Sequence, residues 1–164
     1  MFCDRGGAVV ESRKRGMRMQ DRYLFSGKRI DNGEWVHGYL FDDGFENGRV
    51  FIGGIVIEKY NGTACDDWNV TGINFYEIDP NTICQCTGLK DKNGKLIWEN
   101  DIVMTVYDGN EHIYQVVWDE SELDFKATNG KENYESNFEY LPCCDEIEIL
   151  GNCFDNPELL EVEE

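Results

Sequence analysis

The residue types that could do chemistry here are seven cysteines, two histidines and 33 acids in a chain of 164 residues. Cys84 and Cys86 form a C-x-C pair that could meet the later thiols, but two C-x(2–4)-C knuckles or matched histidines, which structural zinc sites use, are missing. We therefore expect no metal site, and we expect reduced thiols that act as small apolar side chains. The cysteines are Cys3, Cys65, Cys84, Cys86, Cys143, Cys144 and Cys153.

The histidines, His37 and His112, give no catalytic motif. The sequence has no Gly-x-Ser-x-Gly elbow, no phosphate-binding loop and no dinucleotide fingerprint. A nucleophilic pair such as Cys84 with His112 stays open, because such partners meet in space and not in sequence. A histidine on a strand is more often structural, so we expect a protein without enzymatic activity and without a cofactor.

The acids outnumber the 15 bases and give a net charge of −18. This charge disfavours passive binding to phosphate backbones and anionic membranes, and it favours basic partners. Close carboxylates can hydrolyse glycosides or hold Mg²⁺, but acids this abundant form pairs by number alone, so most are expected to be solvated. One cluster is a candidate surface for a basic protein: Asp119, Glu120, Glu122 and Asp124.

The segment "TGLKDKNGKLIWENDIV", residues 87–103, combines a basic cluster with turn residues. Lys90, Lys92 and Lys95 lie near Trp98, which makes a candidate spot for nucleic acid. Asp91, Asn93 and Gly94 are typical of a tight turn, and Asn100 and Asp101 are expected in a second bend. A calcium loop is disfavoured because the later acidic ligands are missing. We expect two linked turns between strands.

Period-two alternation dominates the sequence and predicts a mainly β fold. Asp108–Gly109 between two β runs predicts a hairpin, and Gly53–Gly54 suggests a bulge or a turn. A short helix is expected near the end, where Asn156 can cap and Pro157 suits the first turn. The expected strands cover residues 34–41, 50–59, 73–78, 101–107, 112–118, 124–128 and 146–151.

Aromatic residues at period two are another candidate binding face. On strands such residues are more often buried in a core, and that is what we expect of them here. They are Trp35, Tyr39, Phe41, Tyr76, Trp98 and Trp118.

The pattern predicts two small β lobes. The first covers residues 19–82, and the second covers residues 83–164, with a barrel-like sheet of the SH3 or OB type and the short terminal helix. Residues 1–18 hold five of the 15 bases and show no alternation. We expect them to be a disordered or non-native extension, with translation starting at Met17 or Met19.

Three segments resemble the YopX family of phage and prophage proteins from Gram-positive bacteria. They are "YLFSGKRIDNGEWVHGYL" (residues 23–40), "TGLKDKNGKLIWENDIV" (residues 87–103) and "EILGNCFDNPELLE" (residues 148–161). They follow the family's order, and the resemblance spans residues 19–162 as one unit. Family members often have a glycine at the position of Asn100 and a tyrosine at that of Trp98. Asparagine also tolerates a left-handed bend, so the fold should survive.

The resemblance implies a mostly β fold, a phage or prophage origin and a cytoplasmic location, but no catalytic residue. The leading hypothesis is an accessory protein that binds a host or phage protein, itself basic, through an acidic surface. The alternative is a nucleic-acid-binding β-barrel, which the net charge opposes. An unrecognised hydrolase ranks last, and a homo-oligomer is compatible with each of these.

Overall fold

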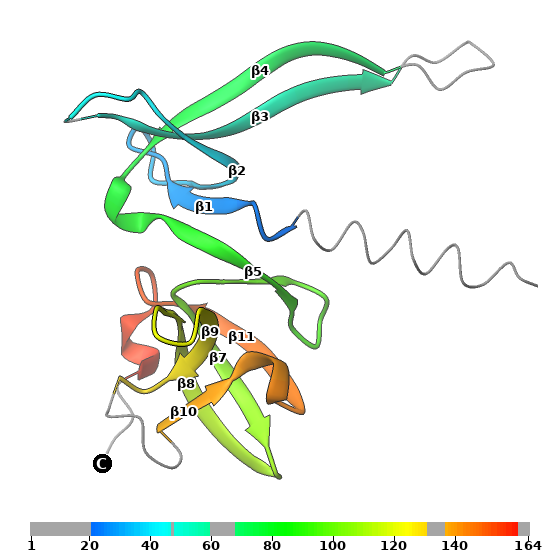
Figure 1. Ribbon diagram of the computed structural model, residues 1–164, viewed down its shortest axis with the longest axis vertical. Coiled ribbons are helices and arrows are strands. Elements are labelled where there is room, and N and C mark those ends of the chain that lie inside the picture. Colours follow the sequence, from blue (N-terminus) through cyan, green and yellow to red (C-terminus); the bar gives the residue numbers. More distant parts are fainter. Residues whose placement is uncertain (1–20, 47, 60–67, 131–136, 161–164) are drawn as a thin grey trace, which may run out of the picture. The chain divides into compact units, whose positions relative to one another are not determined.

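The computed structural model describes residues 21–46, 48–59, 68–130 and 137–160. The chain folds mainly as β-strands joined by turns and short 3-10 helices, which confirms the predicted fold class. The strands divide between two compact units (Figure 1): Leu24–Ile83, and the described residues from Cys84 onwards together with residues 21–23. The proposed extension at residues 1–18 and two of the thiols, Cys3 and Cys65, lie outside the described residues.

The unit Leu24–Ile83 is an antiparallel sheet with the strand order β4-β3-β2-β1. Ile52 and Ile78 are fully buried on one face of this sheet. Gly27 lies against both of them, because a Cβ there would meet the Cδ1 atoms of Ile78 and Ile52 at 2.7 and 3.2 Å. The elements are β1 (Phe25–Lys28), β2 (Trp35–Asp42), β3 (Val50–Lys59), β4 (Trp68–Ile78) and the 3-10 helix η1 (Pro80–Thr82).

The prediction of a bulge or a turn at Gly53–Gly54 is wrong. β3 runs straight through both glycines and shifts register only between Val56 and Ile57. Gly53 is needed for close approach, since a Cβ there would collide with the main-chain oxygen of Asn74 on β4, and a Cβ at Gly38 would lie 2.6 Å from the Gly53 oxygen. The glycines mark close contact between strands, which alternation alone cannot distinguish from a bend.

The second unit holds a five-stranded antiparallel sheet with the order β10-β9-β8-β7-β11, and β5 pairs with β6. Its core includes Ile97, Val103, Val116 and Phe125. The described strands form no closed barrel. The elements are β5 (Cys84–Lys90), β6 (Leu96–Trp98), β7 (Asp101–Tyr107), β8 (Asn110–Asp119), β9 (Asp124–Thr128), β10 (Phe138–Tyr140), η3 (Leu141–Cys143), β11 (Glu146–Asn152) and η4 (Pro157–Leu160).

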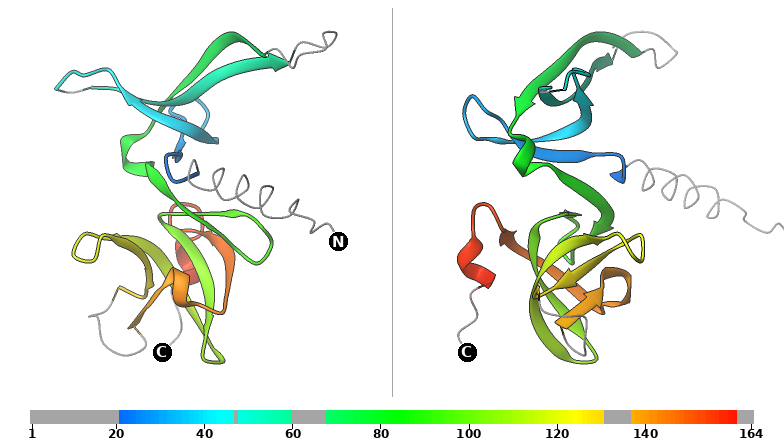
Figure 2. Two further views of the ribbon diagram at one scale, coloured as in Figure 1. Left: turned by 45° about the vertical axis from the view of Figure 1, so that its right-hand side comes forward. Right: turned by 60° about the vertical axis from the view of Figure 1, so that its left-hand side comes forward.

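The predicted hairpin between β7 and β8 is confirmed, and both strands are long and curved (Figure 2). Asp108 and Gly109 have φ values of 48° and 77°, so the turn has two residues and Tyr107 pairs with Asn110. Positive φ at both central positions fits the twist of the flanking strands.

The predicted short terminal helix is present as the 3-10 helix η4 at Pro157–Leu160, in which the Leu159 N–H donates to the Asn156 carbonyl at 3.1 Å. The expectation of burial is wrong for Tyr39 and Phe41, which are exposed because they lie on the open side of β2. Trp118 is also partly exposed, although it packs on the core residue Phe125 with ring centroids 5.0 Å apart. No helix among the described residues has the length and apolar character that crossing a membrane requires.

Candidate functional site

The central turn is organised by Asp91, which is almost fully buried. Its Oδ1 accepts the N–H groups of Asn93 and Lys95, each at 2.9 Å, and its Oδ2 accepts that of Ile149 on β11 at 3.5 Å. Burial works to raise the pKa of Asp91, but these N–H donors outweigh it and hold the pKa below its usual range. Gly94 completes the turn with a φ of 82°.

The three lysines of this region have different environments. Lys92 Nζ lies 2.9 Å from Glu146 Oε1 and 2.6 Å from Glu148 Oε2, and the hydrogen bonds that it donates to the carboxylates of Glu148 and Glu146 raise the pKa of Lys92. Lys92 therefore joins the turn to β11. Lys90 and Lys95 are exposed, and Trp98 is half-buried on β6.

The following bend is built around Asn100, whose φ is 67°. Its Oδ1 accepts a hydrogen bond from Gln115 Nε2 at 2.9 Å, and its Nδ2 donates to Cys84 Sγ at 3.6 Å. The Asn100 N–H donates to the Val116 carbonyl, and the Asn100 carbonyl accepts from the Cys153 N–H. One side chain thus links β5, β8 and the bend before β7.

Asp101 begins β7 and is 9% exposed. Its Oδ2 accepts the Trp98 N–H at 2.8 Å. Burial raises the pKa of Asp101 to about 7, and the charge of Asp91 adds to this effect, while the Trp98 N–H opposes it.

The acids of the β8–β9 hairpin are not equivalent. Asp119 Oδ2 lies 2.6 Å from Lys126 Nζ, its Oδ1 accepts both Ser121 donors, and these bonds lower the pKa of Asp119. Asp119 is therefore tied into the hairpin. Glu120, Glu122 and Asp124 are exposed and available to a partner.

Cys84 and His112, the candidate nucleophilic pair, contact different residues. Burial raises the pKa of Cys84 to about 12, partly offset by the Asn100 amide, so this thiol is protonated at neutral pH. His112 stacks on Tyr114 with ring centroids 5.4 Å apart. Within the described ranges, no three His, Cys, Asp or Glu side chains are grouped closely enough to hold a metal ion.

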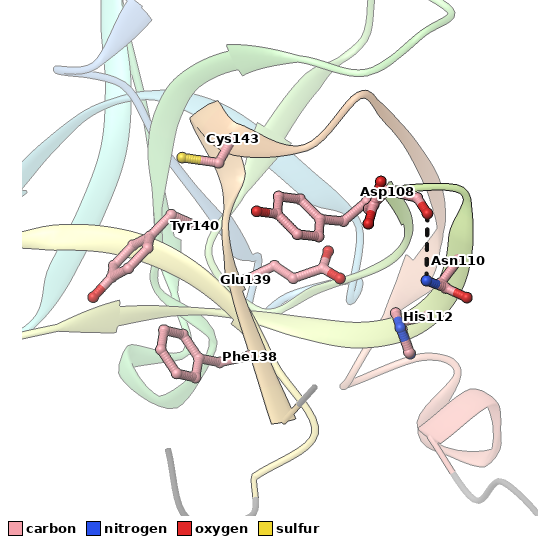
Figure 3. A pocket seen from close by; sticks show the side chains of 8 residues that line it. Asp108, Asn110, His112, Phe138, Glu139, Tyr140 and Cys143 are labelled. Carbon is pink, nitrogen blue, oxygen red and sulfur yellow. Dashed lines mark hydrogen bonds between the residues drawn. The ribbon is translucent and has the colours of Figure 1, made fainter. Parts of the chain in front are cut away.

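A pocket of about 430 Å³ lies between the β7–β8 hairpin and β10 (Figure 3). Glu139 points across it from β10 towards Asp108 and His112, and the rings of Phe138 and Tyr140 lie together on the other side of that strand. Those two rings are 5.4 Å apart and nearly perpendicular. The lining residues are Tyr107, Asp108, Asn110, His112, Phe138, Glu139, Tyr140 and Cys143.

The lining combines two carboxylates with three aromatic rings and contains neither lysine nor arginine, and Lys126 Nζ lies 5.3 Å from the centroid of the Phe138 ring. Carboxylates and ring faces both attract cations, so the pocket suits an ammonium or guanidinium group. Sequence patterns did not predict a role for Tyr107, Phe138, Glu139 or Tyr140. The signal that could have identified the pocket is the aromatic–acid–aromatic run Phe138-Glu139-Tyr140.

The family model described as YopX protein matches residues 46–161, more than half of the chain. The chain belongs to the YopX protein family. The YopX match includes the central turn, the Asn100 bend and every residue that lines the pocket. No curated protein matches the sequence.

Proposed function

We propose that this YopX-family chain is a cytoplasmic phage or prophage accessory protein that binds a basic host or phage protein and catalyses no reaction. The observation that carries the proposal is the pocket at β10, whose lining holds the carboxylates of Asp108 and Glu139 and no lysine or arginine. It is the described feature best suited to a lysine or arginine of a partner.

The chemistry of the pocket supports an arginine or lysine as its occupant. Asp108 and Glu139 offer carboxylates on the side of the β7–β8 hairpin, and charge-assisted hydrogen bonds from a guanidinium are among the strongest that proteins make. Tyr107 adds an aromatic ring to the lining. The Phe138 and Tyr140 rings lie on the other side of β10, and Lys126 Nζ lies 5.3 Å from the centroid of the Phe138 ring.

The charge of the surrounding chain supports the same partner. Residues 84–164 hold 20 acids and five bases, so the segment of the chain that contains the pocket is strongly negative. A field of this sign attracts basic proteins over long distances and accelerates their association.

A capture experiment tests this function. The tagged full chain is incubated with host lysate, with and without nuclease, and then washed at low and high salt. We expect a basic protein that is retained after nuclease treatment and released by salt. Capture should fall at least about tenfold when Asp108→Asn is combined with Glu139→Gln, as expected when charged hydrogen bonds are lost.

The matched control combines Glu120→Gln with Glu122→Gln, which changes the net charge equally on the exposed β8–β9 hairpin. This control should keep most of the capture. If the two double variants lose capture equally, bulk charge alone is responsible and the pocket has no specific role.

Nucleic-acid binding by a barrel-like second lobe is the alternative function. Lys90 and Lys95 are the exposed bases near Trp98, whereas Lys92 is held by Glu146 and Glu148, which leaves a small basic spot. A gel shift at low salt tests it with single- and double-stranded probes. A shift that Lys90→Ala and Lys95→Ala remove would favour this alternative over the protein partner.

A further inference from the structure

The sheet of the unit Leu24–Ile83 has a second face that is apolar and exposed. Cross-strand partners in an antiparallel sheet share a face, and so do alternate residues of one strand. The pairs Phe41–Phe51, Gly53–Phe75 and Ile55–Ile73 therefore lie on the same side of the sheet. The apolar face is defined by the side chains of Tyr39, Phe41, Phe51, Ile55, Ile73 and Phe75.

The two sides of this sheet differ strongly in burial. Ile52 and Ile78 on the opposite side are fully buried, whereas five of the six side chains on the apolar face are between 44% and 60% exposed. Single exposed apolar residues are ordinary, but a contiguous group across three strands is typical of an interaction site.

Gly53 makes this surface continuous. It lies on β3 opposite Tyr39 of β2 and Phe75 of β4, with Phe41 diagonal to it on β2, and a Cβ there would meet the Phe75 ring at 2.7 Å. Because no side chain separates them, the Phe41 and Phe75 rings pack edge to face with centroids 4.9 Å apart. The result is an aromatic surface that crosses the middle strand.

The apolar face carries little negative charge, and Arg49 lies over the Phe51 ring with its guanidinium carbon 5.5 Å from the centroid. Among the alternate positions 35–41, 51–55 and 73–77 on this side of the sheet, the only acid is Glu77, although one residue in five of the whole chain is acidic. A basic partner would find almost no carboxylates there. A second copy would meet no array of like charges and would bring an equally apolar surface.

We propose that the apolar face is the contact between two copies of this chain, packed sheet on sheet around a twofold axis. In a twofold contact the same patch serves both copies, and aligned sheets are a common way to bury two apolar faces. A large side chain has an accessible surface of ~150–250 Å². Five such side chains, each about half exposed, offer roughly 400–600 Å² of surface per copy. With their neighbours, two copies reach the ~1,200 Å² at which specific interfaces begin.

Light scattering coupled to size exclusion tests this contact on the full chain at roughly 100 µM, well above a micromolar Kd. We expect twice the mass of one chain. The test variant combines Ile55→Lys with Ile73→Glu, which replaces the apolar cross-strand pair by an ion pair. It keeps the net charge and a favourable cross-strand contact within the sheet. We expect this variant to have the mass of one chain.

The control combines Leu123→Lys with Leu150→Glu, two exposed leucines of the other unit, and it should remain dimeric. Far-ultraviolet circular dichroism verifies that both variants are folded. A wild-type monomer, including one whose apolar face binds a different protein, overturns the proposal. A dimer that persists in the Ile55→Lys, Ile73→Glu variant also overturns it.

Discussion

At the scale of single residues, Asp101 couples stability to pH. Its pKa is about 7 in the folded protein, against 3.8 for an ordinary aspartate. Because the folded state favours the protonated carboxyl, the stabilisation is complete below about pH 4 and is lost as the pH rises through about 7. The bend before β7 therefore becomes less stable near neutral pH.

The substitution Asp101→Asn removes the free-energy cost of ionising a buried carboxyl group and keeps an oxygen that can accept a hydrogen bond from the Trp98 N–H. At pH 8 the variant should be more stable than the wild type by roughly 2–4 kcal/mol, and at pH 4 the two should be nearly equal. Urea unfolding at both pH values measures the difference. Equal stability at pH 8 would show that the carboxylate is well solvated.

Asp119→Asn supplies a control of opposite sign, because Lys126 and Ser121 lower the pKa of Asp119. Its ionised form stabilises the fold at neutral pH and loses that effect in acid, so this variant should be less stable at pH 8.

Two substitutions of Asn100 distinguish the need for a positive φ from the contribution of the side-chain hydrogen bonds. Asn100→Ala loses the bonds to Gln115 and Cys84 and places a Cβ at a φ of 67°. Asn100→Gly loses the same bonds but fits that φ freely, so it should be more stable than the alanine variant by about 1 kcal/mol. Urea midpoints measure this, and an alanine variant as stable as the glycine variant would contradict it.

At the scale of elements, the contact between β3 and β4 depends on Gly53. Gly53→Ala puts a methyl group into the Asn74 carbonyl oxygen, which a paired backbone cannot avoid. We expect a loss of at least about 3 kcal/mol in the free energy of unfolding, measured by thermal melting.

Gly72→Ala on β4 is the matched control, because nothing lies within 4 Å of a Cβ built there. Its stability should change by less than about 1 kcal/mol. Equal losses in the two variants would mean that strand entropy, and not the close approach, explains the effect of Gly53→Ala.

The elements also show what sequence reasoning can predict. Strands and the Asp108–Gly109 hairpin follow from local patterns, because alternation and turn chemistry act over a few residues. The role of Gly53 could not be predicted, since it depends on Asn74, which is distant in sequence.

The candidate site was less predictable than the strands. Charge clusters identified Lys92 and Asp119, but the structure pairs the first with Glu146 and Glu148 and the second with Lys126. The pocket depends on β10 lying across from the β7–β8 hairpin, a tertiary relation that alternation does not encode. Exposure of Tyr39 and Phe41 was likewise missed, because period two shows that two faces exist but not which one is covered.

At the scale of the whole molecule, the charge of −18 makes stability sensitive to salt. Self-repulsion opposes the compact state, and raising the salt from about 0.01 M to 0.1 M shortens its range from roughly 30 Å to 10 Å. The melting temperature should therefore rise with salt, as differential scanning calorimetry would measure. A fall would show that local pairs such as Lys126–Asp119 outweigh the overall repulsion.

The central claim is that the acidic aromatic pocket binds a basic side chain of a protein partner. Titration of the ¹⁵N-labelled full chain with a short arginine-rich peptide, followed by NMR, tests it most directly. We predict salt-sensitive shifts at Asp108, Asn110 and Glu139 that disappear with Asp108→Asn and Glu139→Gln. Shifts confined to Glu120 and Glu122, or no shifts at low salt, would contradict the claim.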